Sequence, residues 1–166
     1  MTQKISQIAF LIAILFSIYS CSNDSLKSNS TESVSGENVN YDYTPTELET
    51  MGLINDYRVS IGLNTLEKVN YISVKSQEHN TYMIANDVVN HDNFVTRSED
   101  IIKVLGVKKV RENIAYNYNT PQAALNAWLK SPEHKETITG DFTSFGVSVT
   151  ENPANGKKYY TNIFAK

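Results

Sequence analysis

Residues 111–137 read RENIAYNYNTPQAALNAWLKSPEHKET, and this stretch decides the fold. From Glu112 to Tyr118 the residues alternate in polarity and size, which predicts a strand. Thr120 and the proline that follows it predict the start of a helix, and this helix carries the only Trp of the chain. Ser131 is then expected to cap another helix, with His134 in its first turn.

The flanking sequence predicts further elements on both sides of this stretch. Thr44, Pro45 and Glu47 form the pattern of a capping box, so a helix is expected from there to Gly62. A second helix is expected over residues 67–89, and a short one over 98–105 with Ser98 as its cap. Residues 145–150 and 159–164 both alternate around a turn at 152–156, which predicts a hairpin. The economical arrangement is an α+β fold with helices on both faces of a small antiparallel sheet of about three strands.

The first 20 residues have the layout of a secretory signal peptide. Lys4 gives a basic start, and residues 8–18 form an apolar run, interrupted only by Ser17, that is too short to span a bilayer. Cys21 follows directly and resembles the cysteine of a bacterial lipobox, which is diacylated and becomes the mature N-terminus. An uncleaved anchor, or a cleaved signal followed by a free thiol, is the alternative. Because Cys21 is the only cysteine, no disulfide can form within the chain.

Composition divides the remainder into a tether and a domain. Residues 21–43 are rich in Ser, Asn, Asp and Glu, which predicts a disordered tether, and residues 44–166 form the expected domain. The formal net charge of −3 gives no basic surface of the kind that binds nucleic acid. We therefore expect an exported protein that is held at the cell envelope through a lipid on Cys21, with the membrane as its partner.

From residue 44 to the end, the chain resembles the CAP superfamily of cysteine-rich secretory, antigen 5 and pathogenesis-related 1 proteins, in its bacterial SCP-like branch. Each matching motif is weak alone, but their order and spacing together are specific. The resemblance implies an α-β-α sandwich with a large cleft. The motifs are Asn55-Asp56-Tyr57-Arg58 with Gly62-Leu63, His79 to Met83, Asn90-His91 with Arg97, Glu112-Asn113-Ile114-Ala115, Trp128 to His134, and Phe145-Gly146-Val147.

The same resemblance implies the residues of the cleft. In the family two histidines and acidic residues line it, and some members hold a divalent metal such as zinc between the histidines. Carried over, the histidines are His91 and His134, the carboxylate is Glu112, and Asn113 lies beside it. Many animal and plant members place a second Glu on the helix after the Trp, and this chain has none there. Arg111 also stands where a smaller residue is commoner.

The residues alone leave three interpretations of this set open. His91 lies 21 residues before Glu112 and His134 lies 22 after it, so the spacing is not a local metal motif. Two imidazoles and a carboxylate suit a closed hydrogen-bond network, a metal or ligand site, or acid/base catalysis with Glu112 as the candidate catalytic group. The favoured function is a binding module for a small ligand, a lipid or a metal ion. A metal-assisted hydrolase and a structural or interaction protein are the alternatives, and no nucleophilic Ser or Cys is recognisable.

Three residues outside this set receive their own predictions. His79 is interpreted as a hydrogen-bonded wall residue rather than a third ligand. Trp128 is expected in the core with a partner for its indole N–H. Arg58 is expected to pair with a carboxylate or a helix end.

Overall fold

The computed structural model describes residues 39–166. The signal peptide, Cys21 and most of the predicted tether lie outside the described residues. No helix within residues 39–166 combines the length and the apolar character needed to cross a bilayer. The elements in chain order are α1 (Pro45–Ser60), β1 (Glu67–Lys68), α2 (Asn70–Asn86), α3 (Phe94–Leu105), β2 (Val110–Tyr116), α4 (Pro121–Lys130), α5 (Pro132–Ile138), β3 (Ser144–Glu151) and β4 (Lys158–Ala165).

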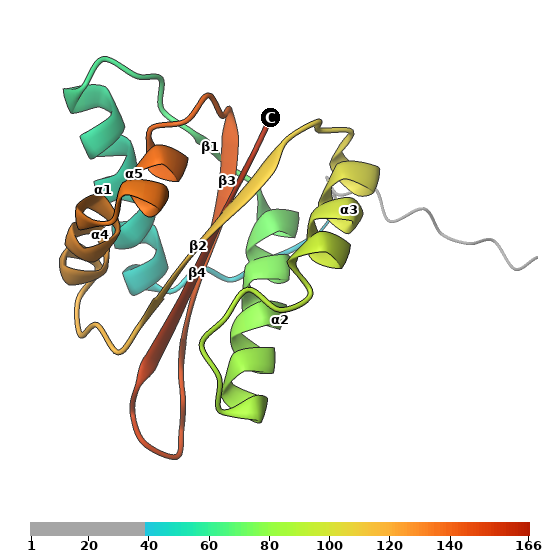
Figure 1. Ribbon diagram of the computed structural model, residues 1–166, viewed down its shortest axis with the longest axis vertical. Helices are drawn as coiled ribbons and strands as arrows, with labels where there is room; N and C mark the ends of the chain where they lie inside the picture. The colour runs from blue at the N-terminus through green and yellow to red at the C-terminus, as the bar shows by residue number, and fades with distance from the viewer. Residues whose placement is uncertain (1–38) are drawn as a thin grey trace, which may run out of the picture. The chain divides into compact units, whose positions relative to one another are not determined.

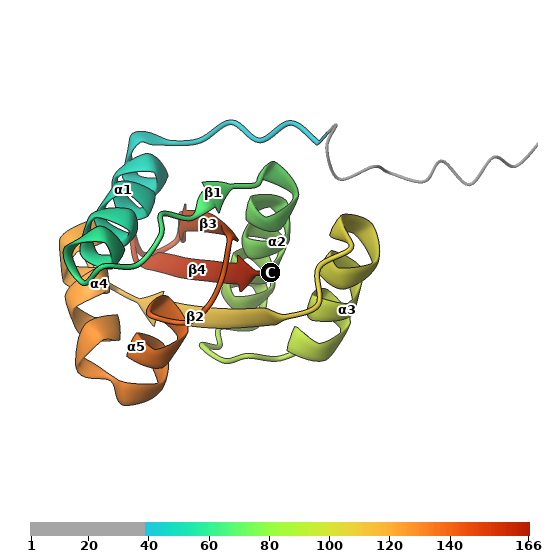
Figure 2. The ribbon, with the colours of Figure 1, turned by 90° about the horizontal axis from the view of Figure 1, so that it is seen from above.

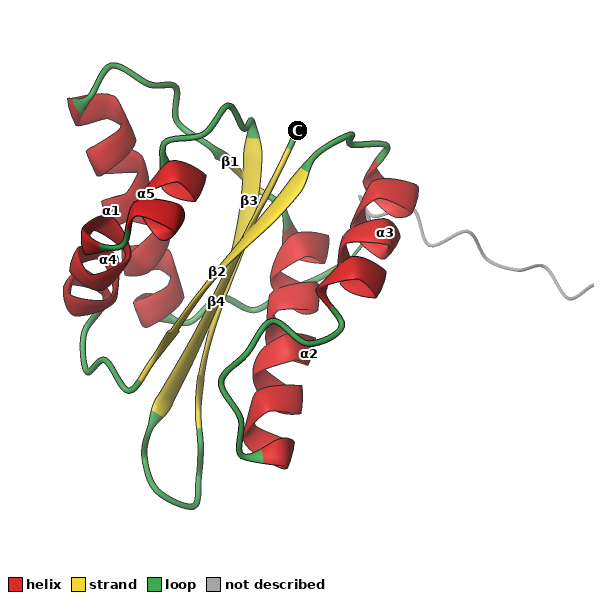
Figure 3. Ribbon diagram, in the orientation of Figure 1, coloured by secondary structure: helices red, strands yellow, loops and turns green. Residues whose placement is uncertain are grey.

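The architecture is an α+β sandwich of three layers, as expected. Helices α1, α4 and α5 cover one face of the sheet, and α2 and α3 cover the other (Figures 1 and 2). The strand order is β1-β3-β4-β2, in which β4 pairs antiparallel with both β2 and β3. The hairpin of β3 and β4 was predicted, and Figure 3 shows it at the centre of the fold. Strand β2 therefore lies at one edge of the sheet.

The prediction of about three strands was short by one, because residues 67–68 form a strand rather than the start of the second helix. The backbone N–H of Glu67 donates to the carbonyl of Thr143 at 2.9 Å, and that of Val69 donates to Phe145 at 3.0 Å. These bonds place β1 parallel to β3. Helix α2 then begins only at Asn70. Such a short strand is defined by its partner and not by a periodicity of its own.

The third helix was also predicted too short. It begins at Phe94, with Asn93 in the left-handed conformation before it, so Ser98 lies inside the helix. The Ser98 hydroxyl donates to the carbonyl of Val95 and caps nothing. Ser131 does precede α5, but its side chain makes no capping hydrogen bond. The cap at Thr44 and the helix start after Thr120 were predicted correctly, and in both the threonine hydroxyl accepts an N–H of the first turn.

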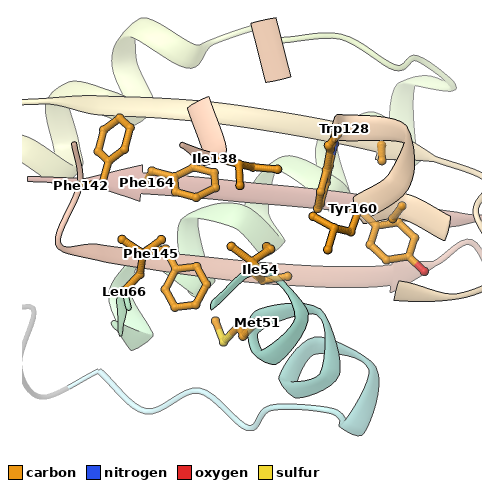
Figure 4. Packing of buried hydrophobic residues seen from close by; sticks show 13 residues of the cluster. Met51, Ile54, Leu66, Trp128, Ile138, Phe142, Phe145, Tyr160 and Phe164 are labelled. Atoms are coloured by element: carbon orange, nitrogen blue, oxygen red, sulfur yellow. The ribbon is translucent and has the colours of Figure 1, made fainter. Parts of the chain in front are cut away.

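The main apolar core lies between the sheet and helices α1, α4 and α5. Figure 4 shows Trp128 and Tyr160 packed together with Phe164 and Ile138 further along the same layer. The indole N–H of Trp128 donates to the carbonyl of Ile114 at 2.9 Å, as predicted for a buried Trp. This bond fixes α4 against the edge strand β2. Only one residue separates α4 from α5, so the Trp128 hydrogen bond also limits where α5 can lie.

Arg58 is fully buried at the end of α1 and binds a helix end, the second of its two predicted alternatives. Its guanidinium donates to the carbonyls of Ile138 at 2.6 Å and Gly140 at 2.9 Å, at the end of α5, and to Asn64. These carbonyls would otherwise be unsatisfied, since the last carbonyls of a helix lack partners within it. Arg58 therefore ties α1 to the far end of the helix that carries His134.

Gly146 lets α2 approach the other face of the sheet closely. A Cβ at this position would collide with the backbone of Ile72 and Ser73. At this close approach the Ser73 hydroxyl accepts the backbone N–H of Val147 at 3.1 Å, which bonds α2 to β3. Helix α2 consequently brings Nε2 of His79 to 4.0 Å from the carboxylate of Glu112 on β2.

The last residues of the predicted tether, 39–43, contact the domain. The Tyr41 hydroxyl donates to the buried carboxylate of Glu47 at 2.7 Å, and the Tyr43 hydroxyl lies 2.9 Å from that of Ser73. The carbonyl of Val39 accepts the side-chain amide of Asn70 at 3.0 Å. The domain of the described residues thus starts before residue 44.

Candidate functional site

A cavity of about 530 Å³ lies at the free edge of β2. Figure 2 shows β2 with α5 on one side and α3 on the other. Side chains from β2, from α5 and the loop after it, and from the connection between α2 and α3 form the lining. The lining residues are His91, Phe94, Lys109, Arg111, Glu112, Asn113, Glu133, His134, Glu136, Thr137, Gly140 and Phe142. The four residues predicted for the cleft, His91, Glu112, Asn113 and His134, therefore lie around one cavity.

The alternation of β2 sends its two central polar side chains to opposite faces of the sheet. Glu112 faces the layer of α2 and α3, where its carboxylate meets Arg97. Asn113 faces the layer of α5, where its amide donates to the carbonyl of His134 at 2.9 Å. Because successive residues of a strand point to opposite faces, the cavity joins both layers around the edge of the sheet.

The carboxylate of Glu112 is held from two sides. Arg97 donates to both of its oxygens, from Nε to Oε2 at 2.8 Å and from Nη2 to Oε1 at 2.9 Å. His91 Nδ1 lies 2.9 Å from Oε1, while the His91 ring stays half-exposed to the cavity. The Glu112 side chain is 1% exposed, and this paired, bidentate arrangement compensates the hydration that its carboxylate loses on burial.

A hydrogen-bonded loop places His91 at the cavity. Asp92 accepts the Tyr82 hydroxyl and the Asn90 side-chain amide through one carboxylate oxygen, each at 2.9 Å. Its backbone carbonyl accepts Nη1 of Arg97 at 3.2 Å. Loop, helix α3 and β2 are therefore fixed by one connected set of bonds, in which polar groups satisfy each other.

His79 is a buried wall residue, in agreement with the prediction. Its Nε2 lies 2.8 Å from the carbonyl of Asn90 and 4.0 Å from Oε1 of Glu112. Burial lowers the pKa of His79 below its ordinary value, and the nearby carboxylate of Glu112 opposes this only partly. The ring is consequently neutral at pH 7 and supports the loop that carries His91.

His134 enters the cavity from the first turn of α5. Burial lowers its pKa, and the neighbouring His91 lowers it further. Its ring makes no hydrogen bond to another residue between 39 and 166. Beside it, Oδ1 of Asn113 is buried and has no partner within the same range. This side of the cavity thus carries a neutral imidazole and an unsatisfied acceptor.

The donor set fits a metal ion only in part. Both oxygens of Glu112 are already engaged, so Glu112 does not serve as a free ligand. Among residues 39–166, no three His, Cys, Asp or Glu side chains are grouped so that they could hold a metal. His91 and His134 remain as the two nitrogen donors that face the cavity. Zinc binding by this pair stays a prediction.

Arg97 is the functional residue whose role the sequence did not reveal. It belongs to one of the motifs, but its partner Glu112 is 15 residues away and belongs to a different motif, on a predicted strand. A buried carboxylate in an edge strand does require a compensating donor, and this requirement is the signal that points to a nearby Arg or Lys. It gives no means of choosing Arg97 over Arg111 or Lys109.

The fold and the site together define a class: a small α-β-α domain with a cleft lined by two histidines and three acidic residues. A family model described as the cysteine-rich secretory protein family, CAP, matches residues 51–164, and the chain belongs to this family. A curated relative, the uncharacterized membrane protein YlbC of Bacillus subtilis, is 31% identical over 130 residues. The match covers 74% of this chain but 35% of that protein, so the chain spans about a third of its length.

Two solved structures from bacteria share the fold. An outer surface protein from Borrelia burgdorferi matches with a TM-score of 0.65 and 22% identity, over 72% of this chain and 90% of that one. An extracellular protein containing a SCP domain from Bacillus anthracis matches with a TM-score of 0.64 and 24% identity, over 76% of this chain and 45% of that one. At these identities the likeness concerns the fold alone.

Proposed function

We propose that this chain is an exported CAP-domain protein of the cell envelope whose cleft binds a small ligand, a lipid or a metal ion. The observation that carries this proposal is the cavity at the edge of β2, where one side holds a neutral imidazole and an unsatisfied acceptor. Ligand sites combine a preformed hollow with a few convergent polar groups of this kind. The printed names of the relatives, a membrane protein, an outer surface protein and an extracellular protein, support a location outside the cytoplasm.

The alternative of a metal-assisted hydrolase is weaker. It would use His91 and His134 as zinc ligands and Glu112 as the general base. A general base needs a free lone pair within reach of the proton that it takes. Arg97 and His91 already occupy the carboxylate of Glu112, which favours a supporting role for this residue.

A ligand screen by thermal unfolding of the full chain tests the binding proposal. The probes are zinc chloride, lysophosphatidylcholine and capped hexapeptides, each against wild type, His91→Ala and His134→Ala. A ligand at 100 times its Kd stabilises the native state by about 2.7 kcal/mol, and a ligand of the cleft loses this effect in the variants. A zinc shift lost in both variants identifies the imidazole pair as the metal site.

Two results contradict the proposal. Shifts that are equal in wild type and in both variants place binding elsewhere. Substrate hydrolysis that disappears in Glu112→Gln, with unchanged unfolding, shows a hydrolase instead of a binding module.

The second half of the proposal is attachment through a lipid on Cys21. The support is the position of this single cysteine directly after an apolar run with a basic start. Mass spectrometry of the membrane fraction is expected to find an N-terminal peptide that begins at a diacylated Cys21. An unmodified Cys21, or an intact signal segment, contradicts the anchor.

A further inference from the structure

The free edge of β2 presents backbone groups to the cavity. The N–H of Lys109 donates to the carbonyl of Lys166, and the N–H of Asn117 donates to that of Lys158, so the odd-numbered residues of β2 pair with β4. In an antiparallel ladder the intervening residues point their N–H and C=O away from the partner. Glu112, Ile114 and Tyr116 therefore direct these groups to the open edge.

These edge groups are largely unpaired. Strand β4 is the one neighbour of β2 in the described sheet, and outside that ladder the backbone N–H groups of Glu112, Ile114 and Tyr116 have no acceptor among residues 39–166. The carbonyl of Ile114 accepts the indole of Trp128, which interrupts the edge once. An exposed row of unpaired donors and acceptors is a template for a further strand.

A second cavity, of about 360 Å³, continues the first along the strand. Residues 111–113 line the first cavity, residues 114–116 line the second, and His134 lines both. The second is mainly apolar, with Val89, Tyr118 and Ala127 in its walls. Six residues of strand extend over roughly 20 Å, so an extended chain laid along β2 would cross both cavities.

The walls of the first cavity carry opposite charges. Lys109 and Arg111 lie on the side of β2, and Glu133 and Glu136 lie on α5. No ion pair within the described part of the chain engages any of these four side chains. Because Lys109 and Arg111 alternate in phase with Asn113, they face the layer of α5, so both signs of charge lie on one side of the sheet. An extended peptide turns every second side chain to this layer, so an acidic and a basic residue two positions apart would each meet a complementary charge.

We infer that the ligand of this cleft is an extended peptide that pairs with the free edge of β2. Its charged residues, one acidic and one basic, lie in the first cavity, and its apolar residues lie in the second. The inference rests on the proposed binding function and specifies its ligand. A lipid with a zwitterionic head would match the charges, but it would leave the edge N–H groups without partners.

An array of capped hexapeptides that contain one Glu, one Lys and four Val in every order tests this inference with the full chain. The tightest peptide is then resynthesised with N-methyl groups on alternate residues, in both registers. Methylation in the register that faces β2 is expected to weaken binding about tenfold, because two backbone hydrogen bonds are lost. Methylation in the other register serves as the matched control and leaves affinity unchanged.

Two further readouts identify the place of binding. Hydrogen exchange followed by NMR is expected to slow at the amides of Glu112 and Tyr116 when the peptide binds. Arg111→Glu is expected to weaken binding about threefold, as for an exposed charge pair, whereas Lys108→Glu, next to the cavity but not in it, does not.

Three outcomes overturn the inference. An array without a binding peptide does so, as does equal loss of affinity in both methylation registers. Binding of lysophosphatidylcholine or zinc at the cleft in the absence of any peptide binding also overturns it, but leaves the proposed binding function intact. Failure of every probe overturns both.

Discussion

The two walls of the cleft differ in how many of their polar side chains are hydrogen-bonded within the domain. The first, which we call the scaffold wall, consists of His79, His91, Arg97 and Glu112. His91 and Arg97 hydrogen-bond to the carboxylate of Glu112 at 2.8–2.9 Å. His79 hydrogen-bonds at 2.8 Å to the carbonyl of Asn90, the residue before His91. The second, the open wall, consists of Glu133, His134 and Glu136 on α5. Its side chains make no hydrogen bond or ion pair with other residues of the described domain.

This difference divides the cleft residues into a hydrogen-bonded set and a set without partners in the described domain. The closed network, one of the three interpretations left open by the sequence, describes the scaffold wall at His91, Arg97 and Glu112, which satisfy each other. One buried atom of this wall, Nδ1 of His79, has no partner within residues 39–166. Groups that are kept apart from partners, as on the open wall, are those that remain available to a ligand. The proposed function thus assigns two of the three interpretations to one cleft, each to its own side.

The largest effect is expected from breaking the scaffold wall at Arg97. In Arg97→Met, the carboxylate of Glu112 stays buried without its cation, which costs about 3–5 kcal/mol of unfolding free energy. Urea unfolding followed by circular dichroism measures this loss. The double variant Arg97→Met/Glu112→Gln removes the charge that remains and is expected to recover part of it.

The matched control comes from the open wall. His134→Gln removes an imidazole that has no partner within residues 39–166, so its unfolding free energy is expected to stay within about 0.5 kcal/mol of wild type. A similar loss in Arg97→Met and His134→Gln would remove the distinction between the two walls.

The sequence predicted the parts of this site that depend on local patterns. The cap at Thr44, the helix start at Thr120, the hairpin and the environment of Trp128 follow from turn chemistry, alternation and the needs of a buried indole. The family resemblance then indicated that His91 and His134 line one cleft, which their spacing alone does not show.

What the sequence did not show depends on contacts between distant segments. Strand β1 exists because its two residues pair with β3, and the early start of α3 accompanies the reach of Arg97 to Glu112. Neither contact produces a periodic pattern in the sequence, because each is made by a single side chain or by backbone groups. The same holds for the unpaired edge of β2, which becomes visible only when the strand order is known.

A smaller effect, dependent on pH, is expected at His79 in the scaffold wall. Burial lowers the pKa of the folded-state imidazole, whereas the unfolded chain titrates near the ordinary value of about 6.5. As the pH falls from 7 to 5, the unfolded state binds a proton that the folded state resists, so stability is complete above about pH 6.5 and decreases below it. Each unit by which the pKa is lowered corresponds to about 1.4 kcal/mol.

The measurement is the difference in unfolding free energy between wild type and His79→Gln as a function of pH. A Gln amide keeps a donor for the carbonyl of Asn90 but does not titrate, so the variant is expected to have a flatter profile between pH 7 and 5. Taking the difference cancels the contributions of His91 and His134, which both proteins share. A difference that is constant over this range would show that the pKa of His79 is the same in the folded and unfolded states, which contradicts a pKa lowered by burial.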